Sequence, residues 1–292
     1  MERKIADANT GKQYLVQGPI YENEQNGIWC GKVYDEEWGN CFVKIAACPT
    51  RDDVDRMKDE ARCATLTEKC SRQVPKLYAH WEDRKAKQYV LVMQWMEGET
   101  LRSWMTKNPP ERWTERTLRE RMEIVSQICS IMESIVRNRA CQMLVHRDLK
   151  PENIMIQRKG KKLEISVIDF GCAALGYVRN VGTTGYQAPE QTGVFRDYSA
   201  KVTQKTDVFA IGQIFYELLL GHAPIIGTDY VRRSGEFVWI SEPSLPDEVK
   251  ALLANDQLER LLRRMTAFES EDRVGYSGII TELRRVNFIK KG

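Results

Sequence analysis

Short apolar runs separated by glycine, asparagine and aspartate follow one another through the first part of the chain. Runs of this kind, rich in valine, isoleucine and aromatic side chains, are typical of β-strands. We expect strands at residues 14–16, 28–34, 40–46 and 89–93. Residues 50–67 begin with side chains that can cap a helix and then carry apolar side chains at helical spacing, which predicts one helix among the strands. The apolar positions of that helix are Val54, Met57, Ala61 and Ala64.

Beyond Leu101 the apolar residues recur every three or four positions, which is the period of a helix with one buried face. Two segments show it most clearly, one with Leu118, Met122, Val125, Ile128, Cys129, Met132 and Val136, the other with Val208, Ile211, Ile214, Phe215, Leu218 and Leu219. Strands followed by helices predict an α+β chain with two segregated lobes. The pattern changes near Glu97, so we expect a small lobe over residues 1–97 and a large lobe over residues 98–292.

The composition is that of an ordinary soluble globular protein, since 42% of the 292 residues are hydrophobic and 29% are charged. This excludes a disordered tail, a collagen and a coiled coil. The 44 basic and 41 acidic side chains leave a formal net charge of +3. Domains that bind nucleic acid usually carry a clustered basic face, so we expect no nucleic-acid partner.

The sequence predicts neither a secretory signal nor a membrane anchor, and we expect a cytoplasmic protein. Residues 1–7 carry no apolar stretch behind their charges, and no run approaches the roughly 18 consecutive apolar residues of a membrane span. The eight cysteines include no C-x-x-C pair, so we expect reduced thiols rather than a disulfide framework. The three histidines are isolated from one another, which argues against a zinc site.

Residues 146–153 read His-Arg-Asp-Leu-Lys-Pro-Glu-Asn and gather three chemically different groups in one loop that contains a proline. Asp148 can orient a hydroxyl group, and Lys150 can neutralise the charge of a transferred phosphoryl group. Asn153 offers a carbonyl oxygen to a metal ion. Phosphoryl transfer requires these three functions, so the loop predicts that chemistry.

A second candidate metal ligand follows the apolar run at residues 165–168. There Asp169 precedes a phenylalanine and a glycine, so that a carboxylate stands at the end of a predicted strand. Carboxylate and amide oxygens are ligands that Mg²⁺ accepts together with phosphate oxygens. We therefore expect Asp169 and Asn153 to share one magnesium site.

These two segments resemble the catalytic loop and the metal-binding Asp-Phe-Gly motif of the eukaryotic-type protein kinase superfamily. Further matches follow in the family's order, because residues 182–190 end in Ala-Pro-Glu, Asp207 lies in a helical segment and Arg273 follows Glu-Asp. The resemblance implies that Asp207 steadies the catalytic loop and that Arg273 pairs with Glu190. It also implies a bilobal protein-kinase fold, with a small β-rich lobe that contains one helix and a larger, mainly helical lobe.

Within that superfamily the chain is similar to serine/threonine kinases and resembles bacterial members. In serine/threonine kinases a threonine, here Thr183, bridges the catalytic aspartate and the lysine two residues after it. The resemblance places Lys44 as the phosphate-binding lysine of the third strand and Glu60 as its ion-pair partner, with Asp59 and Glu68 as alternatives. The implied catalytic set is Asp148, Lys150, Lys44, Glu60 and Thr183.

The resemblance implies ATP and Mg²⁺ as cofactors and protein serine or threonine residues as phosphate acceptors. The residues expected to contact the nucleotide or its metal ion are Lys44, Gly31, Val33, Gln94, Met96, Asn153 and Asp169. Gln94 and Met96 would contact adenine through their backbone groups, and Met93 would lie at the back of the nucleotide pocket.

Two departures from the family pattern concern the nucleotide. The glycine-rich loop retains its last glycine, Gly31, but has asparagine and isoleucine at the positions of the first two. We expect a longer turn at residues 21–26 and altered backbone contacts to phosphate. Phe42 lies on the same strand face as Lys44, where the family usually has a small residue, and would crowd the nucleotide.

The segment between the two motifs that would carry an activating phosphate, residues 172–187, is short, and its first half contains neither serine nor threonine. We therefore expect either activity without phosphorylation of this segment or modification of Tyr177, Thr183 or Thr184. Arg147 is of the type that meets an activating phosphate in related kinases.

Two other functions stay open at this point. The altered glycine-rich loop and Phe42 fit a pseudokinase that serves as an interaction scaffold, although every reactive group is present. Small-molecule phosphotransferases of the aminoglycoside or choline type share the His-x-Asp-x-x-x-x-Asn loop, but they lack counterparts of Glu190, Asp207 and Arg273. A Walker-type nucleotide site is excluded because the Gly-Lys pair at Gly31 is followed by valine.

Overall fold

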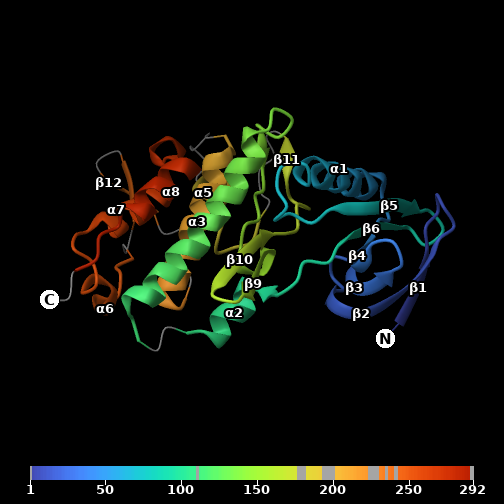
Figure 1. Ribbon diagram of the computed structural model, residues 1–292. Helices are drawn as coiled ribbons and strands as arrows, with labels where there is room; N and C mark the ends of the chain where they lie inside the picture. Colours follow the sequence, from blue (N-terminus) through green and yellow to red (C-terminus); the bar gives the residue numbers. More distant parts are fainter. Residues whose placement is uncertain are drawn as a thin grey trace. The chain divides into compact units, whose positions relative to one another are not determined.

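The computed structural model describes residues 2–109, 112–175, 182–192, 201–222, 230–233, 236–239 and 243–289. The chain divides into two compact units, Met1–Glu97 and Gly98–Gly292. Figure 1 shows that the first unit consists mainly of strands with one helix, whereas the second consists mainly of helices. The predicted α+β class is therefore confirmed.

A six-stranded antiparallel sheet forms the first unit. In spatial order its strands are β1 (Glu2–Ala6), β2 (Gln13–Asn23), β3 (Ile28–Asp35), β4 (Gly39–Ala47), β6 (Gln88–Gln94) and β5 (Leu77–Asp83). Alternate residues of the central strands, among them Val33, Val43 and Ile45, are buried in one apolar cluster. The four strands predicted from the apolar runs are all present, and β1 and β5 extend the sheet at its two edges.

The turn between β2 and β3 differs from our expectation. We predicted a turn over residues 21–26, but β2 continues past its beginning, and Tyr21 pairs with Cys30 of β3. The turn is consequently shorter than predicted. Gly27 closes it with a φ of +61°, and a Cβ atom at this position would lie 2.5 Å from the Cβ of Ala47. Both the backbone conformation and the close approach therefore require glycine here.

The helix predicted at residues 50–67 is α1 (Arg51–Thr67). The Thr50 hydroxyl accepts a hydrogen bond from the Asp53 amide, and the Asp53 carboxylate accepts one from the Thr50 amide, each at 3.2 Å. This reciprocal capping box stabilises the first turn. The apolar face of α1 packs against the sheet in a cluster of Ala46, Cys48, Val54, Met57, Ala61, Tyr89 and Leu91.

The second unit is built from helices. They are α2 (Leu101–Lys107), α3 (Glu115–Arg137), α4 (Pro189–Thr192), α5 (Gln204–Leu220), α6 (Asp247–Lys250), α7 (Gln257–Met265) and α8 (Tyr276–Arg284), with the 3₁₀ turns η1 (Pro151–Asn153) and η2 (Ser270–Asp272). The two long periodic segments of the sequence correspond to α3 and α5. Figure 1 shows α3 beside α5 and α8, and the contacts between these helices form the core of the unit.

Short strands connect the helices. The hairpin of β9 (Ile154–Lys159) and β10 (Lys162–Val167) pairs with β7 (Glu99–Thr100), β8 (Leu144–Val145) pairs with β11 (Ala174–Leu175), and β12 (Tyr230–Arg233) pairs with β13 (Glu236–Trp239). The predicted catalytic loop lies between β8 and β9, and Asp169 follows β10. Paired strands thus fix the ends of both motifs.

Helix α5 lies at the centre of the second unit. Thr203 caps its first turn, and every residue from Thr206 to Leu219 is buried. A Cβ atom on Gly212 would come within 2.6 Å of the Thr266 side chain, so the glycine allows the chain after α7 to pack directly on the helix. Because α5 is enclosed on all sides, polar groups that it carries need partners inside the protein.

Candidate active site

Asp207, in the first turn of α5, binds the backbone of the catalytic loop. Its two carboxylate oxygens accept hydrogen bonds from the backbone amides of His146, at 2.8 Å, and Arg147, at 2.9 Å. Burial raises the pKa of Asp207, while the nearby His146 and the two amides act in the opposite direction. The predicted anchoring of the loop by Asp207 is confirmed.

Arg147 adopts a backbone conformation that non-glycine residues rarely use. Its φ is +67°, and such strain persists where the surrounding structure enforces it. The Arg147 Nε donates to the carbonyl oxygen of Cys172 at 2.5 Å, and its own carbonyl accepts from the Gln191 side chain at 2.9 Å. Arg147 thereby joins the catalytic loop to Cys172, where the segment of residues 172–187 begins, and to Gln191 in α4, beyond its end. The contact with Gln191 was not predicted from the sequence.

Three of the predicted catalytic residues meet at the Asp148 carboxylate. The Thr183 hydroxyl donates to one oxygen at 2.7 Å, and the Lys150 ammonium lies 2.9 Å from the other. Lys150 also donates to the Thr183 hydroxyl at 2.7 Å. Burial acts to lower the pKa of Lys150, but the attraction of Asp148 outweighs it and raises the pKa above 10.5. Lys150 is therefore charged at neutral pH.

Asn153 and Asp169 offer the oxygen atoms that a magnesium ion would need. The Asn153 amide nitrogen donates to the Asp148 carbonyl at 2.9 Å and to its carboxylate at 3.3 Å. This fixes the amide so that its oxygen, an acceptor, points away from Asp148. The Asp169 side chain is exposed, and the residue has a φ of +60°. Its negative charge helps to raise the pKa of Lys150. In the described part of the chain there is no group of three or more His, Cys, Asp or Glu side chains that could hold a metal ion.

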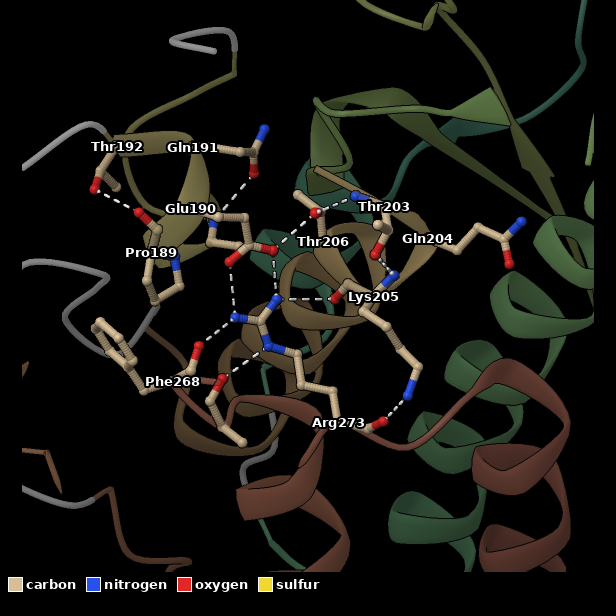
Figure 2. A network of polar contacts seen from close by, with 12 residues as sticks. Pro189, Glu190, Gln191, Thr192, Thr203, Gln204, Lys205, Thr206, Phe268 and Arg273 are labelled. Carbon is tan, nitrogen blue, oxygen red and sulfur yellow. Dashed lines mark hydrogen bonds and ion pairs between the residues drawn. The ribbon is translucent and has the colours of Figure 1, made fainter. Parts of the chain in front are cut away.

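The end of the segment after the Asp-Phe-Gly motif is fixed by a buried ion pair (Figure 2). Arg273 bonds both oxygens of the Glu190 carboxylate, at 2.7 and 2.9 Å. The Thr206 hydroxyl donates to the same carboxylate at 2.7 Å, a contact that the sequence did not predict. The predicted pairing of Arg273 with Glu190 is confirmed, and it holds α4 against the start of α5.

In the first unit, β4 and α1 bring together two buried charges. The Lys44 ammonium lies 2.7 Å from the Glu60 carboxylate. Of the two alternatives considered for the partner, Asp59 is exposed, and the Glu68 carboxylate accepts a hydrogen bond from the Leu77 amide. The predicted ion pair is therefore present, with Glu60 as the partner of Lys44.

The remaining small-lobe residues lie on β3, β4 and β6. A Cβ atom on Gly31 would come within 2.6 Å of the Gln17 carbonyl oxygen, so this glycine is required by close strand packing. Val33 is buried in the sheet core. Phe42 is half-buried on β4 and pairs with Met93 on β6. Gln94 ends β6, and Met96 follows it outside the strand.

Of the residues considered for phosphorylation, Thr184 is exposed, and Thr183 is engaged by Asp148 and Lys150. Tyr177 lies outside the described residues.

Among the described helices, none is both long and apolar enough to cross a membrane.

The chain is similar to known protein kinases. A family model described as "Protein kinase domain" matches residues 36–288. The chain is 32% identical over 163 residues to serine/threonine-protein kinase PrkC of Bacillus subtilis, covering 53% of this chain and 22% of that protein. It is 31% identical over 146 residues to serine/threonine-protein kinase PknB of Mycolicibacterium smegmatis, covering 47% and 21%. The matched segment thus spans less than a quarter of either relative, and the predicted resemblance to bacterial kinases is confirmed.

Proposed function

The chain belongs to the protein kinase family, and we propose that it transfers the γ-phosphoryl group of ATP to serine and threonine hydroxyls of protein substrates. The observation that carries the proposal is the joint engagement of the Asp148 carboxylate by Lys150, at 2.9 Å, and by Thr183, at 2.7 Å. In the proposed reaction Asp148 orients the incoming hydroxyl and accepts its proton. Lys150, held at the same carboxylate, stabilises the charge of the transferred group.

The ion pair of the first unit supports a role in nucleotide binding. Lys44 would neutralise phosphate oxygens of ATP, and Glu60 would hold its ammonium group in one position. Both side chains are buried, so water weakens the attraction between their charges less than it would at the surface. We propose further that Gly31 and Val33 contact the nucleotide from β3.

Adenine would be held at the end of β6. We propose that backbone groups of Gln94 and Met96 contact it, because a backbone contact places little demand on side-chain identity. The half-buried Phe42 on β4 would narrow the nucleotide site.

The residues present fit a magnesium ion. We propose Asn153 and Asp169 as its protein ligands, because a fixed amide oxygen and an exposed carboxylate are the hard donors that Mg²⁺ accepts beside phosphate. When bound, the ion would neutralise charge on the phosphate oxygens. The contact of Asn153 with Asp148 keeps the ligand and the hydroxyl-orienting group in one loop.

We also propose that residues 1–97 and 98–292 are the two lobes of one kinase domain. Because its cosubstrate is ATP, the domain would act in the cytoplasm, and its partners would be proteins with accessible serine or threonine residues. The balanced charge of the chain supports proteins rather than nucleic acid as partners. The alternative of a scaffold without catalysis is disfavoured because Asp148, Lys150 and Thr183 are all present and bonded to one another.

A phosphotransfer assay tests the proposal. The purified chain is incubated with labelled ATP, Mg²⁺ and peptides that differ only in carrying serine, threonine or tyrosine as the acceptor. We expect label on the serine and threonine peptides and none with Asp148→Asn, which keeps the side-chain shape but removes its charge. Asp256→Asn, at an exposed position, is the matched control and should retain activity. Equal labelling by the wild type and Asp148→Asn would contradict the proposed role.

A further inference from the structure

Arg102, in the first turn of α2, bonds three segments that are far apart in the sequence. Its Nε donates to the Glu152 carboxylate in η1 at 2.8 Å, and its Nη2 donates to the Tyr186 hydroxyl at 2.7 Å. Its Nη1 is paired with the Glu217 carboxylate on α5. One guanidinium group therefore connects the end of the catalytic loop, the segment that leads to Glu190, and the central helix.

Arg102 neutralises the buried carboxylate of Glu217. Glu217 is buried in α5, and a buried charge is costly without a partner. Besides Arg102, the Tyr186 hydroxyl donates to this carboxylate at 2.5 Å. Burial raises the pKa of Tyr186, and the hydrogen bond to Glu217 raises it further. Tyr186 thus stays a neutral donor, and its position depends on the carboxylate that Arg102 neutralises.

Two partners of Arg102, Tyr186 and Glu152, are each connected to Asp148 through a neighbouring residue. The Tyr186 amide donates to the Thr183 carbonyl at 3.1 Å, and the Thr183 hydroxyl donates to Asp148. On the other side, Glu152 lies directly before Asn153, whose amide also bonds Asp148. Arg102 does not touch Asp148, but it holds a residue on each of the two segments that position it.

We propose that Arg102 is a positioning residue for phosphoryl transfer: it clamps Glu152, Tyr186 and Glu217 together and so holds Thr183 and Asp148 in position. The proposal rests on the proposed function. A planar guanidinium with several fixed donors can bond three partners at once, whereas a lysine ammonium is a single point of charge. Lysine is therefore expected to restore the pairing with Glu217 but not the whole clamp.

Steady-state kinetics of Arg102→Ala, Arg102→Lys and Lys107→Ala test the clamp. Lys107 is the matched control, because it lies on the same helix and pairs with Glu99 at 2.7 Å but has 65% of its side chain exposed. We expect Arg102→Ala to lower kcat about tenfold or more, since small displacements of reacting groups are costly. KM for ATP should change less than about twofold, because none of Lys44, Asn153 and Asp169 is a partner of Arg102. Arg102→Lys should recover part of kcat, and Lys107→Ala should match the wild type.

A double-mutant cycle separates the clamp from a general loss of stability. Tyr186→Phe removes the hydroxyl that both Arg102 and Glu217 bond. If the residues act as one unit, combining it with Arg102→Ala should lower kcat by less than the product of the two single effects. Fully multiplicative effects would show independent contributions and would count against the clamp.

Hydrogen exchange gives a readout that does not require activity. In Arg102→Ala the backbone amides of residues 144–153 and 182–192 should exchange faster than in the wild type and in Lys107→Ala. If the wild type transfers no phosphate, the proposed function fails, and the exchange result still decides whether the clamp exists. A variant Arg102→Ala that matches Lys107→Ala in both kcat and exchange would overturn the inference.

Discussion

The ion pair of Arg273 and Glu190 (Figure 2) lends itself to a quantitative prediction. Both side chains have 0% relative exposure. The five N–H groups of the guanidinium are all engaged, two by Glu190 and the others by the carbonyl oxygens of Lys205, Ala267 and Phe268. Removing one partner of such a pair leaves the other charge buried. We therefore expect Arg273→Ala to lower the free energy of unfolding by about 3–5 kcal/mol.

Urea unfolding followed by circular dichroism measures this loss, and a more exposed arginine–glutamate pair provides the control. Arg264 lies 2.6 Å from Glu282, with 51% and 25% of the two side chains exposed. Arg264→Ala should cost no more than about 1 kcal/mol, and this cost should shrink with added salt. If Arg273→Ala costs no more than Arg264→Ala, burial does not determine the strength of the pair.

The double variant Glu190→Gln/Arg273→Met sharpens the test. It removes both charges and so leaves neither one buried without a partner. Its cost should be clearly smaller than the sum of the costs of the two single variants, because residues in direct contact are not independent. Additive costs would mean that the two side chains stabilise the fold separately.

Three shorter predictions concern the first unit. Lys44→Met should lower kcat/KM for ATP by about 100-fold or more, measured by phosphotransfer, because it removes a buried charge from the proposed phosphate site. Burial acts to raise the pKa of Asp35, but hydrogen bonds from Lys12 and two amides lower it below 3.8. Asp35→Asn should therefore destabilise the unit above pH 3.8. Unfolding at several pH values should show that the difference in stability between wild type and variant vanishes as the pH falls through the lowered pKa. Gly31→Ala should cost about 1–3 kcal/mol in urea unfolding, whereas Gly275→Ala, which meets open space, should be nearly neutral.

The amphipathic elements of this fold could be predicted because their periodicity is a local property. Segments 50–67, 118–136 and 208–219 lie in α1, α3 and α5 with similar bounds. Strand β1 lacks such a signal, since each of its five residues is exposed or only partly buried at the edge of the sheet. The turn after β2 was misplaced because Gly18-Pro19 interrupts the apolar pattern, although the strand resumes beyond it and pairs again at Tyr21.

The candidate site could be predicted where a motif carries its chemistry within a few residues. Asp148, Lys150 and Asn153 share one loop, so their proximity follows from the sequence. Contacts between distant segments leave no such trace. Arg102 and Glu217 are 115 residues apart, and neither lies in a motif whose spacing points to the other. Only the folded chain shows that both meet beside the catalytic loop.

The contacts of Thr183 distinguish it from Thr184, the other described threonine considered for activation. Its hydroxyl donates to Asp148 and accepts from Lys150, both at 2.7 Å. A phosphate on this oxygen would remove the donated hydrogen bond and place about −1.5 to −2 charges beside the Asp148 carboxylate. Modification of Thr183 would therefore oppose catalysis, whereas the exposed Thr184 could carry a phosphate without this conflict. Arg147 bonds the Cys172 carbonyl, so the catalytic loop is tied to the segment that follows it without any phosphate, and activity without phosphorylation of this segment stays a prediction.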